Sequence, residues 1–332
     1  MELIIAGCTA GRLTLPLREA RPSQRETATN SHTAGKYWGE FMRMMLGAFG
    51  AWLNPKYDDA ARIDFAAEAE ALGYGTVWLG LGQRDLGEFE LVERVLDATA
   101  HVVVATAIVN MWTNGPAVVA DSCNRIQARH PDRFLLGLGV GHPESVTGYR
   151  SPYQIMVSYL DTLDTAGVPA DRRILAALGP RTLRLAAARA AGSHPYLTVP
   201  AHTRAARREL GPEPLLAPEH AAVISADEQQ ARSIGRDFVS DPYLRRSNYV
   251  GNLQRHGYSA DDVADGGSDR LIDDLVPHGT PEAIATRLGE HLEAGADHVA
   301  VQILHEPGES PMPGYRALSK ALQAVGNAWS RG

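Results

Sequence analysis

From residue 46 onward, the chain repeats one pattern: a short apolar or β-branched run, a turn, and a longer segment with one apolar stripe. The first kind of segment predicts a buried strand and the second an amphipathic helix. The predicted strands cover residues 46–53, 76–80, 102–109, 133–140, 173–178, 194–199, 215–225 and 298–304. Helices are predicted between them at residues 57–72, 85–100, 115–129, 151–166, 180–191, 201–210 and 280–294, with a longer polar excursion at 226–277.

The first predicted helix illustrates the apolar stripe. Ala60, Ile63, Ala67 and Ala71 recur at spacings of three and four residues, which predicts that they face a sheet together. Gly73 follows them and is well placed to end the helix, because glycine readily adopts the left-handed conformation common at helix ends.

Strands that alternate with helices are expected to pair in parallel, because each helix returns the chain to the start of the next strand. Eight such units close into a barrel of about 250 residues, which matches residues 46–304. The alternative is an open doubly wound sheet, which usually carries Gly-x-Gly-x-x-Gly before a helix. Here glycines alternate along residues 137–141 and Pro143 follows, so the pattern favours a single (β/α)8 TIM barrel with an insertion after strand seven.

The N-terminal part of the chain lacks this repeat. Residues 12–39 are rich in Thr, Ser, Arg and Pro and show neither a two-residue nor a 3.6-residue period. We interpret residues 1–45 as an irregular N-terminal extension outside the fold, and residues 46–332 as the barrel domain. The segment ending at Cys8 looks like a lipoprotein cleavage box, but acidic Glu2 and a short apolar run do not suit a secretory signal.

Composition narrows the class of partner. The chain has 332 residues, of which 44% are hydrophobic and 21% charged, as in an ordinary globular protein. The net charge is −7 at pH 7 and the densest basic stretch, residues 204–208, is short, so we expect no nucleic-acid partner. No apolar run approaches the roughly 20 residues of a membrane helix. Cys8 and Cys123 form neither a disulfide framework nor a zinc motif, which predicts a cytoplasmic protein without a metal site.

A candidate anion site follows strand five. In a barrel, ligand groups come from the carboxyl ends of the strands, and here Leu178 and Gly179 lead into a helix with Pro180 in its first turn. Proline there loses no donor, glycine allows close backbone approach, and the N–H groups of Arg181 and Thr182 would face an anion. The segment therefore predicts a phosphate site, with an ordinary proline-capped helix start as the alternative.

Strand four ends in the small residues Gly139, Val140 and Gly141, followed by His142. Small residues leave room for a flat ring against the backbone, and an imidazole exchanges a proton near neutral pH. His142 is therefore the candidate catalytic residue, although a histidine at a strand end more often serves only as a hydrogen-bonding group.

Large side chains follow strands one and three. Trp52, Met111 and Trp112 predict a flat apolar wall for a small-molecule substrate, with burial in the core as the alternative. The excursion at 226–277 is interpreted as a lid over the same end of the barrel, because barrels vary most in these loops; a solvated insertion is the alternative.

Together, these segments resemble the bacterial luciferase-like superfamily, and within it the actinobacterial oxidoreductases that use the deazaflavin coenzyme F420. The resemblance spans about residues 46–328. It rests on the segments TAIVNMWTN (106–114), RFLLGLGVGH (133–142), LAALGPR (175–181), HPY (194–196), GSDRL (267–271) and AGADHV (294–299).

The resemblance implies that F420 lies in the mouth of the barrel and exchanges a hydride with a small organic substrate. It places the phosphate of the coenzyme on the segment from Leu178 to Thr182, which is also the candidate anion site. Family members carry a non-prolyl cis peptide after strand three, expected here near Ala107–Ile108. The edge of the ring would contact Asn110, and the segment from Gly139 to His142 would lie beside it.

One departure from the family bears on the reaction. The sugar-phosphate dehydrogenase relatives carry an Asp-His pair at the end of strand two, with the histidine as base, where this chain has Gly80 and Leu81. Reduction of an activated C=C, C=N or C=O bond needs only one acid, and His142 stands where those relatives carry an acidic proton donor. We therefore expect a reductase, and leave open an FMN-dependent luciferase-like monooxygenase, a non-catalytic cofactor-binding barrel and assembly as a homodimer.

Overall fold

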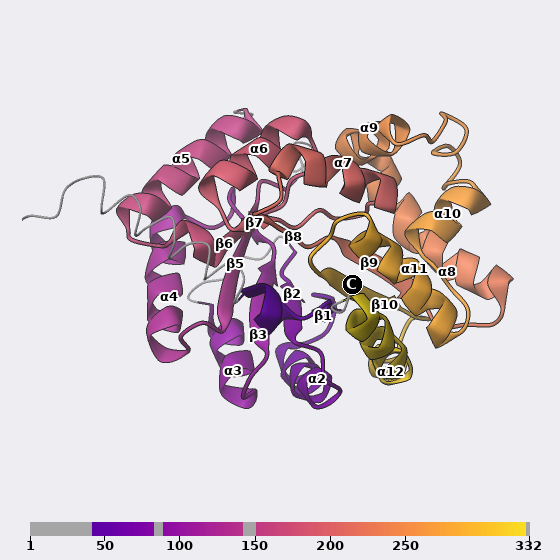
Figure 1. Ribbon diagram of the computed structural model, residues 1–332, viewed down its shortest axis with the longest axis horizontal. Coiled ribbons are helices and arrows are strands. Elements are labelled where there is room, and N and C mark those ends of the chain that lie inside the picture. The colour runs from indigo at the N-terminus through magenta and orange to yellow at the C-terminus, as the bar shows by residue number, and fades with distance from the viewer. Residues whose placement is uncertain (1–41, 83–88, 142–150, 330–332) are drawn as a thin grey trace, which may run out of the picture.

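A computed structural model describes residues 42–82, 89–141 and 151–329. The chain forms a parallel, curled sheet that helices surround (Figure 1). The strands are β1 (Phe49–Leu53), β2 (Thr76–Gly80), β3 (Val103–Ala107), β4 (Val109–Asn110), β5 (Phe134–Gly139), β6 (Arg173–Leu175), β7 (Gly192–Ser193), β8 (Leu215–Leu216), β9 (Glu219–Val223) and β10 (Val299–Leu304). Their order is β8-β7-β6-β5-β3-β2-β1-β10-β9, and β4 pairs with β5.

The two outermost strands of this order, β8 and β9, are consecutive pieces of one extended segment, so the sheet closes on itself. Only Ala217 and Pro218 separate them. The Ala217 N–H donates to Ser193 O, and the Ala300 N–H donates to Pro218 O, each at 2.9 Å. Taking β3 with β4 and β8 with β9 as single barrel strands leaves eight in the part of the chain described. The predicted (β/α)8 barrel is therefore confirmed.

The barrel helices lie outside the sheet, and the insertion after β9 forms a separate group beside β9 and β10 in Figure 1. The outer helices are α2 (Asp59–Ala71), α3 (Glu90–Ala98), α4 (Pro116–Arg129), α5 (Pro152–Thr165), α6 (Pro180–Arg189), α7 (Pro200–Leu210), α11 (Pro281–Glu293) and α12 (Met312–Trp329). The insertion contains α8 (Glu228–Ser240), the 3-10 turn η3 (Tyr243–Arg245), α9 (Ser247–Arg255) and α10 (Asp269–Leu275). No helix among the residues described is both long and apolar enough to cross a membrane.

The ends of α2 follow the sequence, but its buried face does so only in part. Asp58 caps the helix by accepting the Ala61 N–H at 2.8 Å, and Gly73 has a φ of 86° just beyond its end. The predicted stripe is right only in part: Ile63 packs against the core, but Ala60 and Ala71 are exposed. The residues that the helix buries are Arg62, Ala66 and Ala69. Arg62 tolerates burial because its guanidinium donates to Gly80 O at the end of β2.

The predicted sixth strand at 194–199 is also wrong, because the observed strand β7 ends at Ser193. Pro195 has no N–H for a ladder, and Leu197 has a φ of 54°, so the chain cannot stay extended. The segment instead crosses the mouth of the barrel before α7 begins at Pro200.

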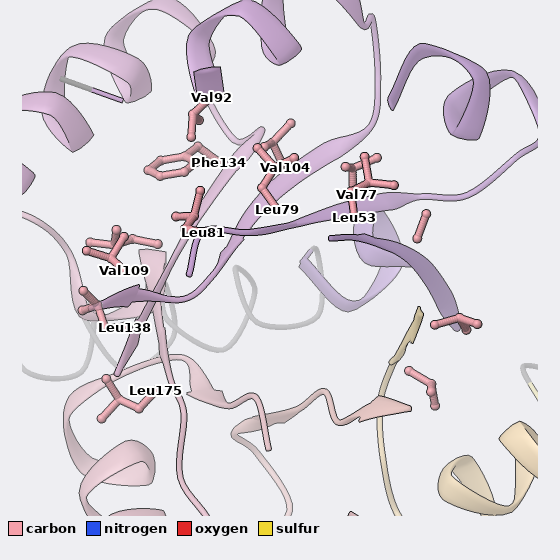
Figure 2. Close-up of a cluster of buried hydrophobic side chains, with 14 of the residues drawn as sticks. Leu53, Val77, Leu79, Leu81, Val92, Val104, Val109, Phe134, Leu138 and Leu175 are labelled. Atoms are coloured by element: carbon pink, nitrogen blue, oxygen red, sulfur yellow. The ribbon is translucent and has the colours of Figure 1, made fainter. Parts of the chain in front are cut away.

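Alternating side chains on the strands build two apolar layers. Val77 and Leu79 point outward into the core between sheet and helices, where Figure 2 shows them with Phe134 of β5 and Val92 of α3. Trp78, between them in sequence, points inward. The inner layer fills the barrel with Trp52, Trp78, Val103, Ala105, Leu135, Ile174, Leu215, Ala217 and Ala300.

A helical turn at residues 42–46 packs with this inner layer, since Met42 and Leu46 belong to the same buried cluster. Arg43 Nε donates to Asp297 Oδ1 at 2.9 Å. Packed structure therefore begins before the expected domain boundary at residue 46, and the rest of the expected extension, residues 1–41, lies outside the described residues.

Candidate active site

A cavity of about 470 Å³ lies at the carboxyl ends of the barrel strands. Among the lining residues described, Arg246 is the one charged side chain, and aromatic and small residues predominate. The lining comprises Trp52, Asn54, Pro55, Gly80, Gly82, Ala107, Ile108, Asn110, Val140, Gly141, Ala176, Leu178, His194, Tyr196, Pro242, Tyr243, Arg246, Asn248 and Tyr249. A cavity of this size and composition suits a flat organic ring better than a strongly charged ligand.

The insertion forms part of the cavity wall. Tyr243 of η3 and Tyr249 of α9 line the cavity, together with Arg246 between them. The expectation that the excursion at 226–277 covers the mouth of the barrel therefore agrees with its position, and a purely solvated insertion does not.

The segment at the end of β3 supplies apolar cavity wall. The peptide bond Ala107–Ile108 is cis, as the family resemblance implies, and Ile108 lines the cavity. A Cβ on Gly139 would lie 2.9 Å from Ile108 Cδ1 and 3.1 Å from the Cβ of Ala176. Because Gly139 of β5 has no side chain, the Ile108 side chain can pack against this strand.

Asn110 lies in the cavity wall, but its two large neighbours do not. The Asn110 Oδ1 accepts the Trp112 N–H at 2.9 Å. Met111 is buried in the outer layer between sheet and helices, and Trp112 does not line the cavity. Of the three residues expected to form the substrate wall, Trp52 alone reaches the cavity in the residues described.

The candidate anion segment stands at the cavity edge. Leu178 lines the cavity, whereas Gly179 caps α6 and accepts a hydrogen bond from Thr182 Oγ1 at 2.9 Å. The exposed Arg181 holds its guanidinium carbon 3.7 Å from the centroid of the Tyr153 ring. The helix start thus faces solvent beside the cavity, where a ligand tail could leave it.

The expected catalytic residue, His142, lies outside the described residues. Val140 and Gly141, which precede it, both line the cavity. The role of His142 remains a prediction from the sequence.

Three tyrosines form a group that the sequence reasoning missed. The Tyr243 hydroxyl donates to the Tyr196 hydroxyl at 2.9 Å, and Tyr196 donates to Gln302 Oε1 at 3.1 Å. The Tyr249 ring lies 5.4 Å from that of Tyr243. Burial raises the pKa of Tyr243 to about 12 and those of Tyr196 and Tyr249 well above their ordinary value, so all three stay neutral near pH 7. The HPY segment contains Tyr196 and the predicted lid contains Tyr243 and Tyr249, but neither pattern indicates that the three side chains meet.

Glu219 is a buried acid near the tyrosines, and no motif or spacing in the sequence indicates it. The side chain is 1% exposed, and Oε2 accepts the Leu197 N–H at 3.3 Å. Burial raises the pKa of Glu219 to about 8, so the carboxyl group is mostly protonated at neutral pH. Burial is the main cause of the raised pKa values of Tyr196, Tyr243 and Tyr249, and the Glu219 carboxylate adds to it once that group is ionised.

The end of strand two carries no titratable side chain. Gly80 faces the Trp52 indole, and Leu81 is buried in the outer layer. Across the residues described, no group of three or more His, Cys, Asp and Glu side chains is placed to hold a metal ion.

Comparison with known proteins supports this architecture. Residues 40–166 match the family model described as luciferase-like monooxygenase. The fold resembles an F420-dependent secondary alcohol dehydrogenase in complex with an F420-acetone adduct, at a TM-score of 0.66 and 15% identity over 85% of this chain and 99% of that one. None of the curated proteins compared with the sequence matches it.

Two further solved structures are similar. Coenzyme F420-dependent tetrahydromethanopterin reductase from Methanopyrus kandleri has a TM-score of 0.62 and 16% identity, over 84% of this chain and 97% of that chain. The oxygenating constituent of 3,6-diketocamphane monooxygenase from Pseudomonas putida, in complex with FMN, has a TM-score of 0.63 and 13% identity, over 85% and 98%. The TM-scores of these three structures show a shared fold.

Proposed function

We propose that this luciferase-like chain is an F420-dependent oxidoreductase that works as a reductase on a small organic substrate. The direction of hydride transfer is inferred from the residues at the end of β2. The indole of Trp52 fills the space beside Gly80. The sugar-phosphate dehydrogenases that the sequence resembles carry an Asp-His pair at this position, with the histidine as base. Reduction needs a hydride and one proton but no base at this position.

The described residues fit the ring of such a coenzyme. Ile108 and Ala176 line the cavity with apolar atoms, and Gly139 lets them pack together because a Cβ there would meet both. Asn110 and Gly141 border the same cavity. A flat, largely apolar wall with few polar groups is the usual form of a site for a ring of this kind.

The coenzyme tail would lie along the start of α6. The N–H groups of Arg181 and Thr182 belong to the first turn, where the positive end of the helix dipole favours a phosphate. Arg181 adds a cationic side chain exposed beside the cavity. Leu178 lines the cavity and connects the two parts of the proposed site.

Reduced F420, when bound, supplies a hydride to the activated double bond of the substrate. His142 supplies the proton to the product in this proposal, because in the sequence it directly follows Gly141, which lines the cavity. Trp52 and Tyr249, both buried, and the half-buried Tyr196 and Tyr243 exclude water from the reacting atoms in this proposal, which protects the hydride donor and strengthens hydrogen bonds to the substrate.

An FMN-dependent monooxygenase is the second candidate, and the Pseudomonas putida structure with FMN has the same fold. Ring and phosphate sites of this kind accommodate either coenzyme. The two functions differ in chemistry, because a deazaflavin transfers hydride but reacts poorly with oxygen.

Single-turnover reactions separate the candidates. Enzyme with one equivalent of reduced F420 is mixed with cyclohexenone, a cyclic imine or a ketone in the absence of oxygen, and coenzyme oxidation is followed by absorbance. We expect coenzyme oxidation with at least one of these compounds, and slower product protonation in His142→Ala. Turnover that occurs only with reduced FMN and oxygen would instead establish the monooxygenase.

A further inference from the structure

Two buried side chains of the cavity wall each keep one polar atom without a hydrogen-bond partner among the residues described: the indole Nε1 of Trp52 and the imidazole Nε2 of His194. Trp52 is 6% exposed and His194 is 1% exposed, and both line the cavity. Buried polar atoms are nearly always paired in folded proteins, so two such atoms in one cavity wall point to a ligand.

The hydrogen-bonding role of each atom is fixed. His194 Nδ1 lies 2.7 Å from Ala217 O, and because a carbonyl only accepts, Nδ1 carries the proton. Burial lowers the pKa of His194 to about 4, so the ring is neutral near pH 7 and Nε2 presents a lone pair. The Trp52 indole N–H can only donate.

The Trp78 ring supports one face of the His194 ring. The Trp78 ring stacks on it with centroids 4.1 Å apart and planes 10° apart. Trp78 Nε1 donates to His298 Nε2 at 2.9 Å, and His298 Nδ1 donates to Gly47 O at 2.7 Å. The stack holds the plane of the His194 ring, and the Nδ1 bond to Ala217 O orients the ring within that plane.

We propose that Trp52 and His194 bind a neutral amide-type edge of the substrate, in which a carbonyl oxygen accepts from Trp52 Nε1 and an N–H donates to His194 Nε2. A carboxylate fits poorly, because it has no hydrogen to offer to His194. The assignment of this edge to the substrate rests on the proposed function, since the ring of F420 or FMN also carries a carbonyl beside an N–H.

A matched pair of planar lactams tests the proposal without the coenzyme. The full chain is titrated with 2-quinolinone, which has the N–H, and with N-methyl-2-quinolinone, which lacks it. We expect the first to bind about tenfold more tightly, the effect of one good buried hydrogen bond. Equal affinities would overturn the proposal.

Two variants at one position assign the preference to His194. His194→Gln keeps an acceptor near the position of Nε2, so it retains the preference for 2-quinolinone. His194→Asn is too short to place one there, so it binds both lactams equally. A preference that persists unchanged in His194→Asn would contradict the assignment.

A measurement on the unmodified protein guards against variants that do not fold. In nitrogen-15 spectra, 2-quinolinone should shift both the His194 Nε2 signal and the Trp52 indole signal, whereas the N-methyl compound should shift only the indole strongly. Absence of a shift at both nitrogens would overturn the proposal.

Saturating F420 distinguishes the two sources of the amide edge. Binding of 2-quinolinone that survives in the presence of F420 supports a substrate site, and competitive loss of that binding overturns the assignment to substrate. If F420 does not bind at all, the proposed function fails, while the lactam titrations still decide the hydrogen-bonding pair.

Discussion

The Trp52 indole lies so close to Gly80 that residue 80 has no room for a side chain. A Cβ added at Gly80 would come within 2.6 Å of Trp52 Cη2 and 2.8 Å of Pro55 Cδ. Strands β1 and β2 are neighbours, and Trp52 pairs in register with Trp78, two residues before Gly80. The cavity wall at this position is therefore an indole face, and a titratable side chain there would require the indole to move.

This contact predicts coupling between the two positions. Gly80→Ala should lower the free energy of unfolding by about 1–3 kcal/mol, because the new methyl group overpacks the site. In a Trp52→Ala background the same change should cost much less. Urea unfolding of the single and double variants measures the coupling, with Gly115→Ala as the control because no atom lies within 4 Å of a Cβ there. Additive effects would show that the indole does not occupy this space.

Much of the fold follows from periodicity, because burial against helices imposes the alternation of strand and helix on the sequence. Strand β2 lies at the predicted residues 76–80, and the cis peptide falls at Ala107–Ile108 as the resemblance implies. The predicted strand ends at residue 109, but β4 continues through Asn110, whose side chain faces the cavity. Alternation then places the next side chain, Met111, in the outer layer, and a strand end misplaced by one residue hides this.

The polar groups of the cavity were harder to predict than its shape. Tyr196 and Tyr243 lie 47 residues apart and meet through one hydrogen bond, which no local pattern indicates. Glu219 is the first residue of β9, and the first residue of a barrel strand normally lies at the end of the barrel away from the active site. Here β8 and β9 together form one barrel strand interrupted at Pro218, so Glu219 lies halfway along it. Long-range contacts and one proline thus decide which polar side chains meet.

Glu219 should make the protein less stable as the pH rises to about 8. Its carboxyl pKa is raised to about 8 in the folded state, so between its unfolded pKa and about 8 the unfolded state has already lost a proton that the folded state keeps. Glu219→Gln removes this difference. We expect the variant to gain at least about 1 kcal/mol relative to the original chain between about pH 5 and pH 8, measured by urea unfolding. An equal difference at both pH values would contradict the raised pKa.

Buried histidines should have the opposite effect on the acid side. Burial lowers the pKa values of His194, His202, His220 and His298 to about 4. In the unfolded state they titrate near 6.5, so below about pH 6.5 the unfolded state binds protons that the folded state does not. Stability should therefore fall as the pH drops from about 6.5 to 4, with Glu219 offsetting one of these four protons.

Urea unfolding at several pH values in this window measures that slope. The midpoint concentration should decrease steadily from about pH 6.5 to 4.5, before most surface carboxylates titrate. A constant midpoint across the window would show that these histidines accept protons in the folded state.

The proposed phosphate contact predicts a difference between two arginines on α6. Arg181 stands in the first turn beside the cavity, whereas Arg184 is exposed one turn later and pairs with Glu209. Arg181→Ala should weaken F420 binding about three- to tenfold, and the effect should shrink at high salt because the contact is exposed. Arg184→Ala should leave the affinity nearly unchanged. Fluorescence titration compares the two, and equal losses would place the phosphate elsewhere.

The choice of coenzyme is the central question, and a fluorescence titration of the full chain with F420 and with FMN answers it. We predict saturable binding of F420 with one site per chain, tighter than that of FMN, and weakened in Arg181→Ala. Tight binding of FMN alone would contradict an F420-dependent enzyme and would make the luciferase-like monooxygenase the function of this cavity.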